Sequence, residues 1–261
     1  MNSQRPVVLC FSGHDPSGGA GIQADIETVI SHQCHCCSVI TALTEQDTRN
    51  VKKLLPQRPE EIIAQADTLL ADFRVAAIKI GLIGHADTAR ALQQVLSRHP
   101  GIPVVLDPVL AAGGGQALAD AELPAAIKTL LLPLVTVLTP NSPEARQLTG
   151  LDALDDCGLA LQDLGAENVL ITGSHEDTGL VRNILYMPGG GQQAFDWQRL
   201  PHGYHGSGCT LAAAIAALLA QGLDAYTAVS EAQDFTWQAL QAAYRPGQGQ
   251  HNPNRLFWVE A

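Results

Sequence analysis

The stretch Val7-Val-Leu-Cys-Phe-Ser-Gly-His-Asp-Pro-Ser-Gly-Gly-Ala-Gly21 decides the fold of this chain. Residues 7–12 form a short and almost entirely apolar run, which predicts a buried strand. The glycines and the proline that follow predict a loop, and residues 20–31 then carry the pattern of a helix. A buried strand that leads through a loop into a helix is typical of a parallel α/β sheet.

The same alternation of short apolar runs and amphipathic segments continues to the end of the chain. Further strands are predicted at residues 38–42, 75–80, 102–107, 134–139 and 168–172, and a β-hairpin at 180–187 and 194–200. Further helices are predicted at 59–71, 87–98, 121–131, 143–148, 154–164, 208–221 and 224–244. This order predicts an α/β protein with a mostly parallel central sheet and helices on both faces. No repeat or linker interrupts it, so residues 1–261 are expected to form one domain.

The composition excludes several classes of function. The chain has 15 Lys+Arg against 26 Asp+Glu, a net charge of −11, whereas a general nucleic-acid binder needs clustered positive charge. No apolar run approaches the length of about 18 residues that a membrane span needs, so no membrane partner is expected. The six cysteines are scattered, and residues 1–6 are too polar to begin a secretory leader. We therefore expect reduced thiols and a cytoplasmic protein.

In open parallel sheets, ligands bind beyond the carboxyl ends of the strands, and the segment Gly206-Ser-Gly-Cys209 before helix 208–221 suits such a site. Its glycines let the backbone approach a ligand, and the first amides of a helix attract a phosphoryl group. The alternative is a plain helix start capped by Ser207. In the first turn the pKa of the Cys209 thiol would fall, so that it could accept a proton. Alternatively, Cys209 is a small buried thiol.

Three oxygen-bearing side chains follow strands that should be neighbours in the sheet. Asp107 ends one predicted strand, and Asn141 and Glu144 follow the next. Hard oxygen ligands of this kind suit Mg²⁺, which bridges nucleotide phosphates. Each residue alone is also explained by turn chemistry, because Asp-Pro and Pro-Asn-Ser-Pro are turn formers.

The loop at residues 13–21 has neither a Walker A motif nor a dinucleotide-binding fingerprint. It is rich in glycine, acidic and free of lysine, which suits a polar neutral or basic small molecule. Asp25 could accept hydrogen bonds from such a molecule, or it could be a solvated helix carboxylate. A Cys-x-x-Cys pair, Cys34 and Cys37, raises the weaker alternative of a thiol redox protein.

Taken together, the motifs resemble those of bacterial hydroxymethylpyrimidine/phosphomethylpyrimidine kinases, thiamin-biosynthesis enzymes of the ribokinase-like superfamily. The matching segments are Asp15-Pro-Ser-Gly-Gly-Ala-Gly-Ile-Gln-Ala-Asp25, Ser38-Val-Ile-Thr-Ala-Leu43, Asp107-Pro-Val109, Thr139-Pro-Asn-Ser-Pro-Glu144 and His205-Gly-Ser-Gly-Cys-Thr210. Lys79-Ile-Gly-Leu82 and the Gly247/Gly249 tail also fit. The resemblance covers essentially the whole chain. It implies a three-layer α/β/α sandwich, a homodimer, and a kinase dependent on ATP and Mg²⁺. Such a kinase phosphorylates the hydroxymethyl group of the pyrimidine and then the monophosphate.

The resemblance also implies a role for individual residues. The pyrimidine would be contacted by Gly13, Asp25, Gln46 and Val109. The nucleotide would be contacted by Asn141, Glu144 and Thr172, and Mg²⁺ would be held by Asp107 and Glu144. An anion hole would be formed by Gly206, Ser207, Gly208 and Cys209, with Cys209 where sugar-kinase relatives carry the catalytic aspartate.

The chain departs from the family pattern at three positions. Thr172 begins the run Thr172-Gly-Ser-His175, where a lysine is typical, Ser207 replaces a threonine, and His14 replaces a threonine or serine. Loss of the lysine removes a positive charge from the ATP phosphates. Two alternatives follow: a paralogue that acts on pyridoxal or pyridoxine, and a non-catalytic homologue that binds the pyrimidine.

Overall fold

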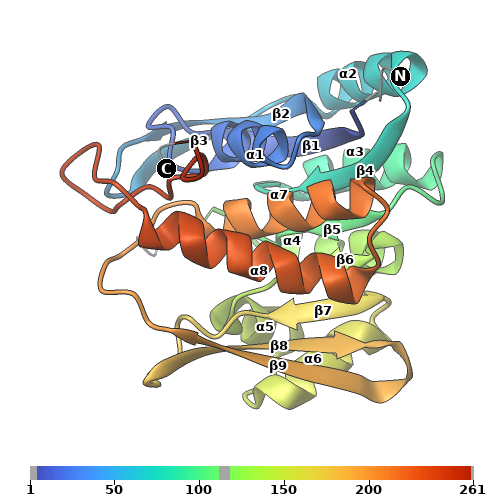
Figure 1. Cartoon of the computed structure of the whole chain (residues 1–261). Coiled ribbons are helices and arrows are strands. Elements are labelled where there is room, and N and C mark those ends of the chain that lie inside the picture. The colour runs from blue at the N-terminus through green and yellow to red at the C-terminus, as the bar shows by residue number, and fades with distance from the viewer. Residues whose placement is uncertain (1–4, 112–117, 260–261) are drawn as a thin grey trace.

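A computed structural model describes residues 5–111 and 118–259, so residues 1–4 of the polar amino-terminal stretch considered above lie outside it. The described strands form one nine-stranded sheet in the order β3-β2-β1-β4-β5-β6-β7-β8-β9 (Figure 1). The strands are β1 (Val7–His14), β2 (His35–Gln46), β3 (Val51–Pro56), β4 (Val75–Ile80), β5 (Val104–Leu106), β6 (Val137–Leu138), β7 (Asn168–Ile171), β8 (Leu180–Met187) and β9 (Gly191–Gln198).

The central six strands are parallel, as the sequence predicts, and the sheet ends in antiparallel strands on both sides. β3 pairs antiparallel with β2, and β8 pairs antiparallel with both β7 and β9. Strand β3 was not predicted. Its sequence carries Lys52 and Lys53 on an exposed edge, and charged residues of this kind are common on edge strands but weaken the alternating pattern.

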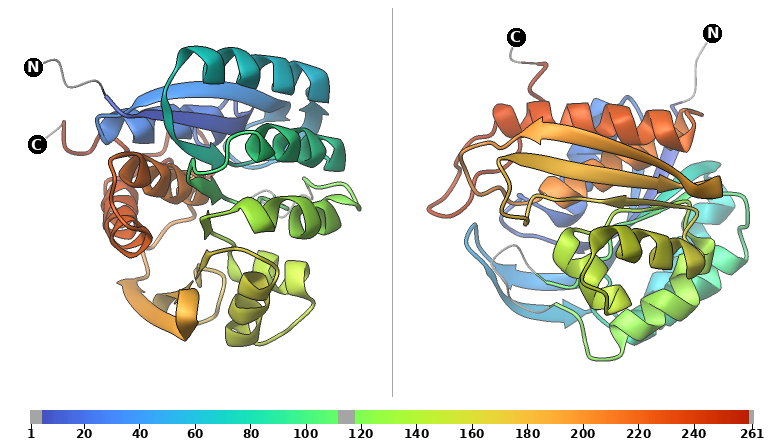
Figure 2. Two further views of the ribbon diagram at one scale, coloured as in Figure 1. Left: turned by 90° about the vertical axis from the view of Figure 1, so that its right-hand side faces the viewer. Right: turned by 90° about the horizontal axis from the view of Figure 1, so that it is seen from below.

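The helices cover both faces of the sheet, which confirms the predicted three-layer α/β/α sandwich (Figure 2). One face carries α1 (Gly21–Ser31), α7 (Ser207–Ala220) and α8 (Ala225–Gln241). The other carries α2 (Pro59–Asp72), α3 (Ala86–Ser97), α4 (Leu123–Ala126), α5 (Ser142–Thr149) and α6 (Leu154–Asp163). Each face has its own buried apolar cluster, and α7 is apolar nearly all round because it packs between the sheet and its neighbours α1 and α8.

The predicted helix at 121–131 and the predicted strand at 134–139 differ most from the structure. After α4 the chain continues as a π-helical turn (Ile127–Leu131) and a 3₁₀ turn (Leu132–Leu134). Pro133 lacks the amide proton that a regular helix needs here, so the helical segment tightens and ends. Strand β6 then shortens to Val137–Leu138, which still pairs parallel with both β5 and β7.

Among the described residues, no helix combines the length and the apolar character that crossing a bilayer requires.

Candidate active site

A cavity of about 690 Å³ opens where the carboxyl ends of the parallel strands meet. It runs along this edge of the sheet, from the carboxyl ends of β1 and β2 to the residues that follow β7 and β9. All the predicted site residues except Asp25 line it: Gly13, Gln46, Asp107, Val109, Asn141, Glu144, Thr172, Gly206, Ser207, Gly208 and Cys209. The structure therefore brings together side chains that are far apart in the sequence.

The amino terminus of α7 points its amides into this cavity. Gly206 precedes the helix in a left-handed conformation (φ 86°) and provides no side-chain cap, so the alternative of a Ser207 cap is wrong. Among the described residues, no acceptor bonds the amides of Ser207, Gly208 or Cys209. A helix start with free amides carries partial positive charge, which makes it a ready site for an anion.

Two features explain why this turn has its shape. A Cβ atom on Gly206 would lie 1.9 Å from the carbonyl oxygen of Gly19, so only glycine fits between the two loops. Behind them lies Arg255, which is 1% exposed and donates to the Thr210 hydroxyl (2.9 Å), the Gly19 carbonyl (2.5 Å) and the Glu27 carboxylate (2.9 Å). This buried guanidinium joins the loop after β1, helix α1 and the first turn of α7.

Two carboxylates face the same cavity from segments that follow the neighbouring strands β5 and β6. Glu144 forms a capping box with Asn141: its amide donates to Asn141 Oδ1 (2.9 Å) and its Oε2 accepts from the Asn141 amide (3.0 Å). Asp107 lies at the start of α7, where a Cβ on Gly208 would be 3.5 Å from its Oδ2. Burial raises the pKa of both carboxyls, and their mutual repulsion raises the pKa of Glu144 further.

These carboxylates fit a hydrated divalent cation. Within the described part of the chain, no group donates a hydrogen bond to the buried Asp107 carboxylate, which leaves both of its oxygens for a cation or its water. The described residues contain no cluster of three or more acidic, histidine or cysteine ligands. A cation here would therefore complete its shell with water and with oxygens of a bound ligand.

Cys209 lies in the first turn of α7, but its thiol does not have the lowered pKa that the sequence predicts. Burial raises the pKa of Cys209 to about 11, and the Asp107 and Asp25 carboxylates add to this, although Lys79 acts in the opposite direction. The helix start is thus outweighed by desolvation and by nearby negative charge. At neutral pH the free protein carries a protonated thiol at this position.

Asp25 does not line the cavity, although the sequence predicts that it contacts the substrate. It lies beneath the cavity, where its Oδ1 accepts from Lys79 Nζ (2.7 Å) and its Oδ2 from the Ser12 hydroxyl (2.5 Å). Lys79 also donates to Ser12 (3.0 Å), and all three side chains are 0% exposed. Burial alone lowers the pKa of Lys79, but the Asp25 carboxylate raises it above its ordinary value, so the lysine stays protonated. A contact between Asp25 and the substrate remains a prediction.

The loop after β1 is tied to the anion-binding turn by a second pair. Asp15 is 2% exposed and accepts from His205 Nε2 at 2.8 Å. It also accepts from the amides of Ser17 (2.8 Å), Gly19 (3.0 Å) and Ala20 (2.8 Å). Burial raises the pKa of Asp15, but the hydrogen bonds from His205 and Ser17 outweigh it and hold the pKa well below its usual range. The Asp15–His205 pair therefore fixes the loop after β1 relative to the turn at Gly206.

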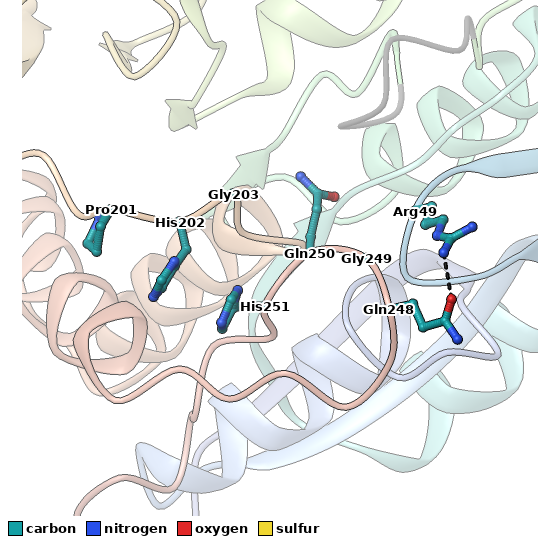
Figure 3. A pocket seen from close by; sticks show the side chains of 8 residues that line it. All are labelled: Arg49, Pro201, His202, Gly203, Gln248, Gly249, Gln250 and His251. Atoms are coloured by element: carbon teal, nitrogen blue, oxygen red, sulfur yellow. Dashed lines mark hydrogen bonds between the residues drawn. The ribbon is translucent and has the colours of Figure 1, made fainter.

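A smaller hollow of about 490 Å³ adjoins the cavity and shares part of its wall (Figure 3). In Figure 3 the rings of His202 and His251 lie face to face, with centroids 4.0 Å apart. The amide of His251 donates to the Gly203 carbonyl (2.9 Å), and the amide of Gln250 donates to the Thr48 carbonyl (2.8 Å). The carboxy-terminal tail therefore connects the turn between β2 and β3 to the segment that leads into Gly206.

The thiol redox alternative is wrong. Cys34 and Cys37 are both buried, in the apolar clusters on opposite faces of the sheet, so they cannot meet as a redox pair.

Sequence reasoning missed several residues of the site. The one signal for the Lys79 network was a lysine inside the apolar run 75–80. For Arg255 the sequence offers no signal, because nothing in the tail pattern predicts burial.

Solved structures of small-molecule kinases have the same fold. The ADP complex of Bacillus subtilis pyridoxal kinase has a TM-score of 0.91 and 28% identity, covering 99% of this chain and 100% of that one. A phosphomethylpyrimidine kinase from Clostridium difficile has a TM-score of 0.80 and 30% identity, covering 90% of this chain and 100% of that one. The fold and the site define a ribokinase-like small-molecule kinase.

Sequence comparison gives the family. The family model described as phosphomethylpyrimidine kinase matches residues 15–254. A Haemophilus influenzae hydroxymethylpyrimidine/phosphomethylpyrimidine kinase is 38% identical and covers 94% of each chain. A Staphylococcus aureus protein of the same name is 32% identical, covering 97% of this chain and 95% of that one. The chain belongs to the phosphomethylpyrimidine kinase family.

Proposed function

We propose that the protein uses ATP and Mg²⁺ to phosphorylate hydroxymethylpyrimidine and then its monophosphate. The observation that carries this proposal is the start of α7, whose free amides share one cavity with the buried carboxylates Asp107 and Glu144. Phosphoryl transfer depends on positioning and charge neutralisation more than on covalent chemistry. Relatives named for the pyrimidine activity support this substrate over a pyridoxine-like one, and the kinase family supports catalysis over mere binding.

Each group of the site then has a task. The amides of residues 207–209 would hold the transferring phosphoryl group as negative charge develops on it. Asp107 and Glu144 would hold Mg²⁺, which neutralises phosphate charge when it is bound. Gly13 and Gln46 line the end of the cavity near β1 and β2, and Val109 lines it just after β5. The pyrimidine would contact these three residues. Asn141 and Thr172, which are joined by a β-bridge, line the nucleotide end.

Cys209 would orient the substrate hydroxyl or take its proton. With a pKa raised to about 11, the thiol of the free protein is protonated and suits the first role better. Replacing Cys209 with Ala lowers turnover by about 10² if the thiol is the base. A loss of less than tenfold limits Cys209 to orientation.

A panel assay tests the proposal. The full chain is incubated with ATP, Mg²⁺ and hydroxymethylpyrimidine, its monophosphate, pyridoxal or pyridoxine, and the products are detected by mass. The expected result is a mono- and a diphosphate from the pyrimidine substrates. No phosphorylated pyrimidine in any reaction would refute it. The homodimer implied by the resemblance and the cytoplasmic location expected from the cysteines remain predictions, which light scattering and cell fractionation would check.

A further inference from the structure

The charges around the cavity are unbalanced toward the negative. Its acidic lining residues are Asp15, Asp107 and Glu144, and Arg199 is the one arginine or lysine among the described residues that line it. A nucleoside triphosphate would bring several more negative charges into this space. Polyphosphates are bound where cationic donors or metal ions offset their charge, so the place of this single guanidinium matters.

Arg199 lies at the nucleotide end of the cavity. It directly follows β9, and β9 runs parallel to β7 because each pairs antiparallel with β8. The carboxyl ends of β7 and β9 therefore share the edge of the sheet that also carries Thr172. Gly13 and Gln46, at the proposed pyrimidine end, lie at the carboxyl ends of β1 and β2, on the other side of the sheet centre.

Backbone carbonyls hold the Arg199 guanidinium in place. Its Nη1 donates to Ser174 (2.8 Å), its Nη2 to Glu176 (2.9 Å) and its Nε to Thr178 (3.1 Å). A guanidinium has five N–H donors, so one donor remains on each of the two terminal nitrogens. These donors carry the guanidinium's positive charge, and hydrogen bonds from charged donors to phosphate oxygens are strong.

No acidic side chain in the described ranges forms an ion pair with Arg199, so its charge is not offset. Two other arginines do form ion pairs. Arg146 of α5 pairs with Glu176, whose carbonyl accepts from Arg199 (2.7 Å for the ion pair), and Arg182 pairs with Asp196 (2.7 Å) across the β8–β9 hairpin. Arg199 alone of these three combines a fixed position, free donors and an uncompensated charge at the cavity wall.

From these observations we infer that Arg199 binds the phosphates of the nucleotide. The inference rests on the proposed function, which it deepens by naming a cationic phosphate contact. The clamp on the loop at residues 174–178 places the charge before the nucleotide arrives, so little side-chain entropy is lost on binding.

Calorimetric titration with a graded set of ligands tests this inference. Wild-type protein, Arg199→Gln, Arg199→Lys and the matched control Arg182→Gln are each titrated with the non-hydrolysable analogue AMP-PCP plus Mg²⁺, with ADP and with adenosine. Arg199→Gln is expected to weaken AMP-PCP about tenfold or more and ADP less, and to leave adenosine unchanged. Arg199→Lys, which keeps the charge, should recover part of the loss, and Arg182→Gln should bind all three ligands like the wild type.

The opposite results are equally distinct. An equal loss for all three ligands, with no recovery by lysine, would mean that Arg199 only shapes the loop, and the inference would be overturned. Unchanged AMP-PCP binding by Arg199→Gln would also overturn it. In either case a wild-type protein that phosphorylates the pyrimidine leaves the proposed function standing. A wild type that binds no nucleotide and forms no product refutes both.

Discussion

The two ends of the cavity use ion pairs in opposite ways. Beneath the β1 end, Lys79 and Asp25 form a pair in which both side chains are 0% exposed. Beside the β9 end, Arg182 and Asp196 pair at a similar distance with side chains 62% and 37% exposed. The distances are alike, but water screens one pair and not the other. The buried pair belongs to the frame of the site, whereas the exposed pair lies on the surface of the β8–β9 hairpin and does not line the cavity.

The largest effect should follow from breaking the buried pair. Replacing Lys79 with Met leaves the Asp25 carboxylate buried without its cation, which typically costs about 3–5 kcal/mol in the free energy of unfolding. Urea titration measures the loss. The double variant Lys79→Met/Asp25→Asn removes both charges and should recover a large part of it. If Lys79→Met unfolds at the same urea concentration as the wild type, the pair is not part of the frame.

The next effect concerns the turn that joins the two ends. Replacing Gly206 with Ala places a methyl group against the Gly19 carbonyl and displaces the amides of α7, so turnover should fall by about 10² to 10³. Gly222→Ala at the other end of α7 is the matched control. Gly222 also has a positive φ (93°), but no atom lies within 4 Å of the place that an added Cβ would take. Steady-state assays should show full turnover for the control; equal losses in both variants would argue against displacement of the amides.

A smaller effect should come from Asp15, whose depressed pKa makes its contribution depend on pH. A carboxyl with a lowered pKa in the folded protein stabilises the fold above its unfolded pKa of about 3.9. That contribution is lost as the pH falls through the folded pKa. Asp15→Asn should therefore cost about 1–3 kcal/mol at pH 7 and less at pH 3. Urea titrations at both pH values check this, and a difference that does not narrow at pH 3 would contradict it.

The contrast between the two ends also explains what the sequence could predict. The parallel core was predictable because each buried strand carries a short apolar run, and β3 was not, because its lysines lie on an open edge. The cluster at Gly206, Asp107 and Glu144 followed from one rule, that the carboxyl ends of parallel strands meet at a shared edge.

What the sequence could not predict depends on burial and on partners that are distant in the chain. Lys79 on β4 meets Asp25 on α1 only in the folded protein, and no local sequence pattern indicates that both side chains are buried from water. The pKa of Cys209 depends in the same way on Asp107 and on the packing around it, so a rule about helix starts gave the wrong direction. Arg199 had no signal in a polar strand end.

The smallest effect is expected from breaking the exposed pair, Arg182 and Asp196. Replacing Arg182 with Gln, or Asp196 with Asn, removes a charge that water already screens, so neither variant should shift the melting temperature measurably. Adding 1 M salt should change the melting of wild type and variants alike, because the Debye length is then only about 3 Å. The opposite result would be a marked loss of stability in both Arg182→Gln and Asp196→Asn that disappears in 1 M salt. It would show that the exposed pair stabilises the fold, so that the two pairs differ only in how strongly water screens them. The hairpin that positions Arg199 would then depend on its surface charges.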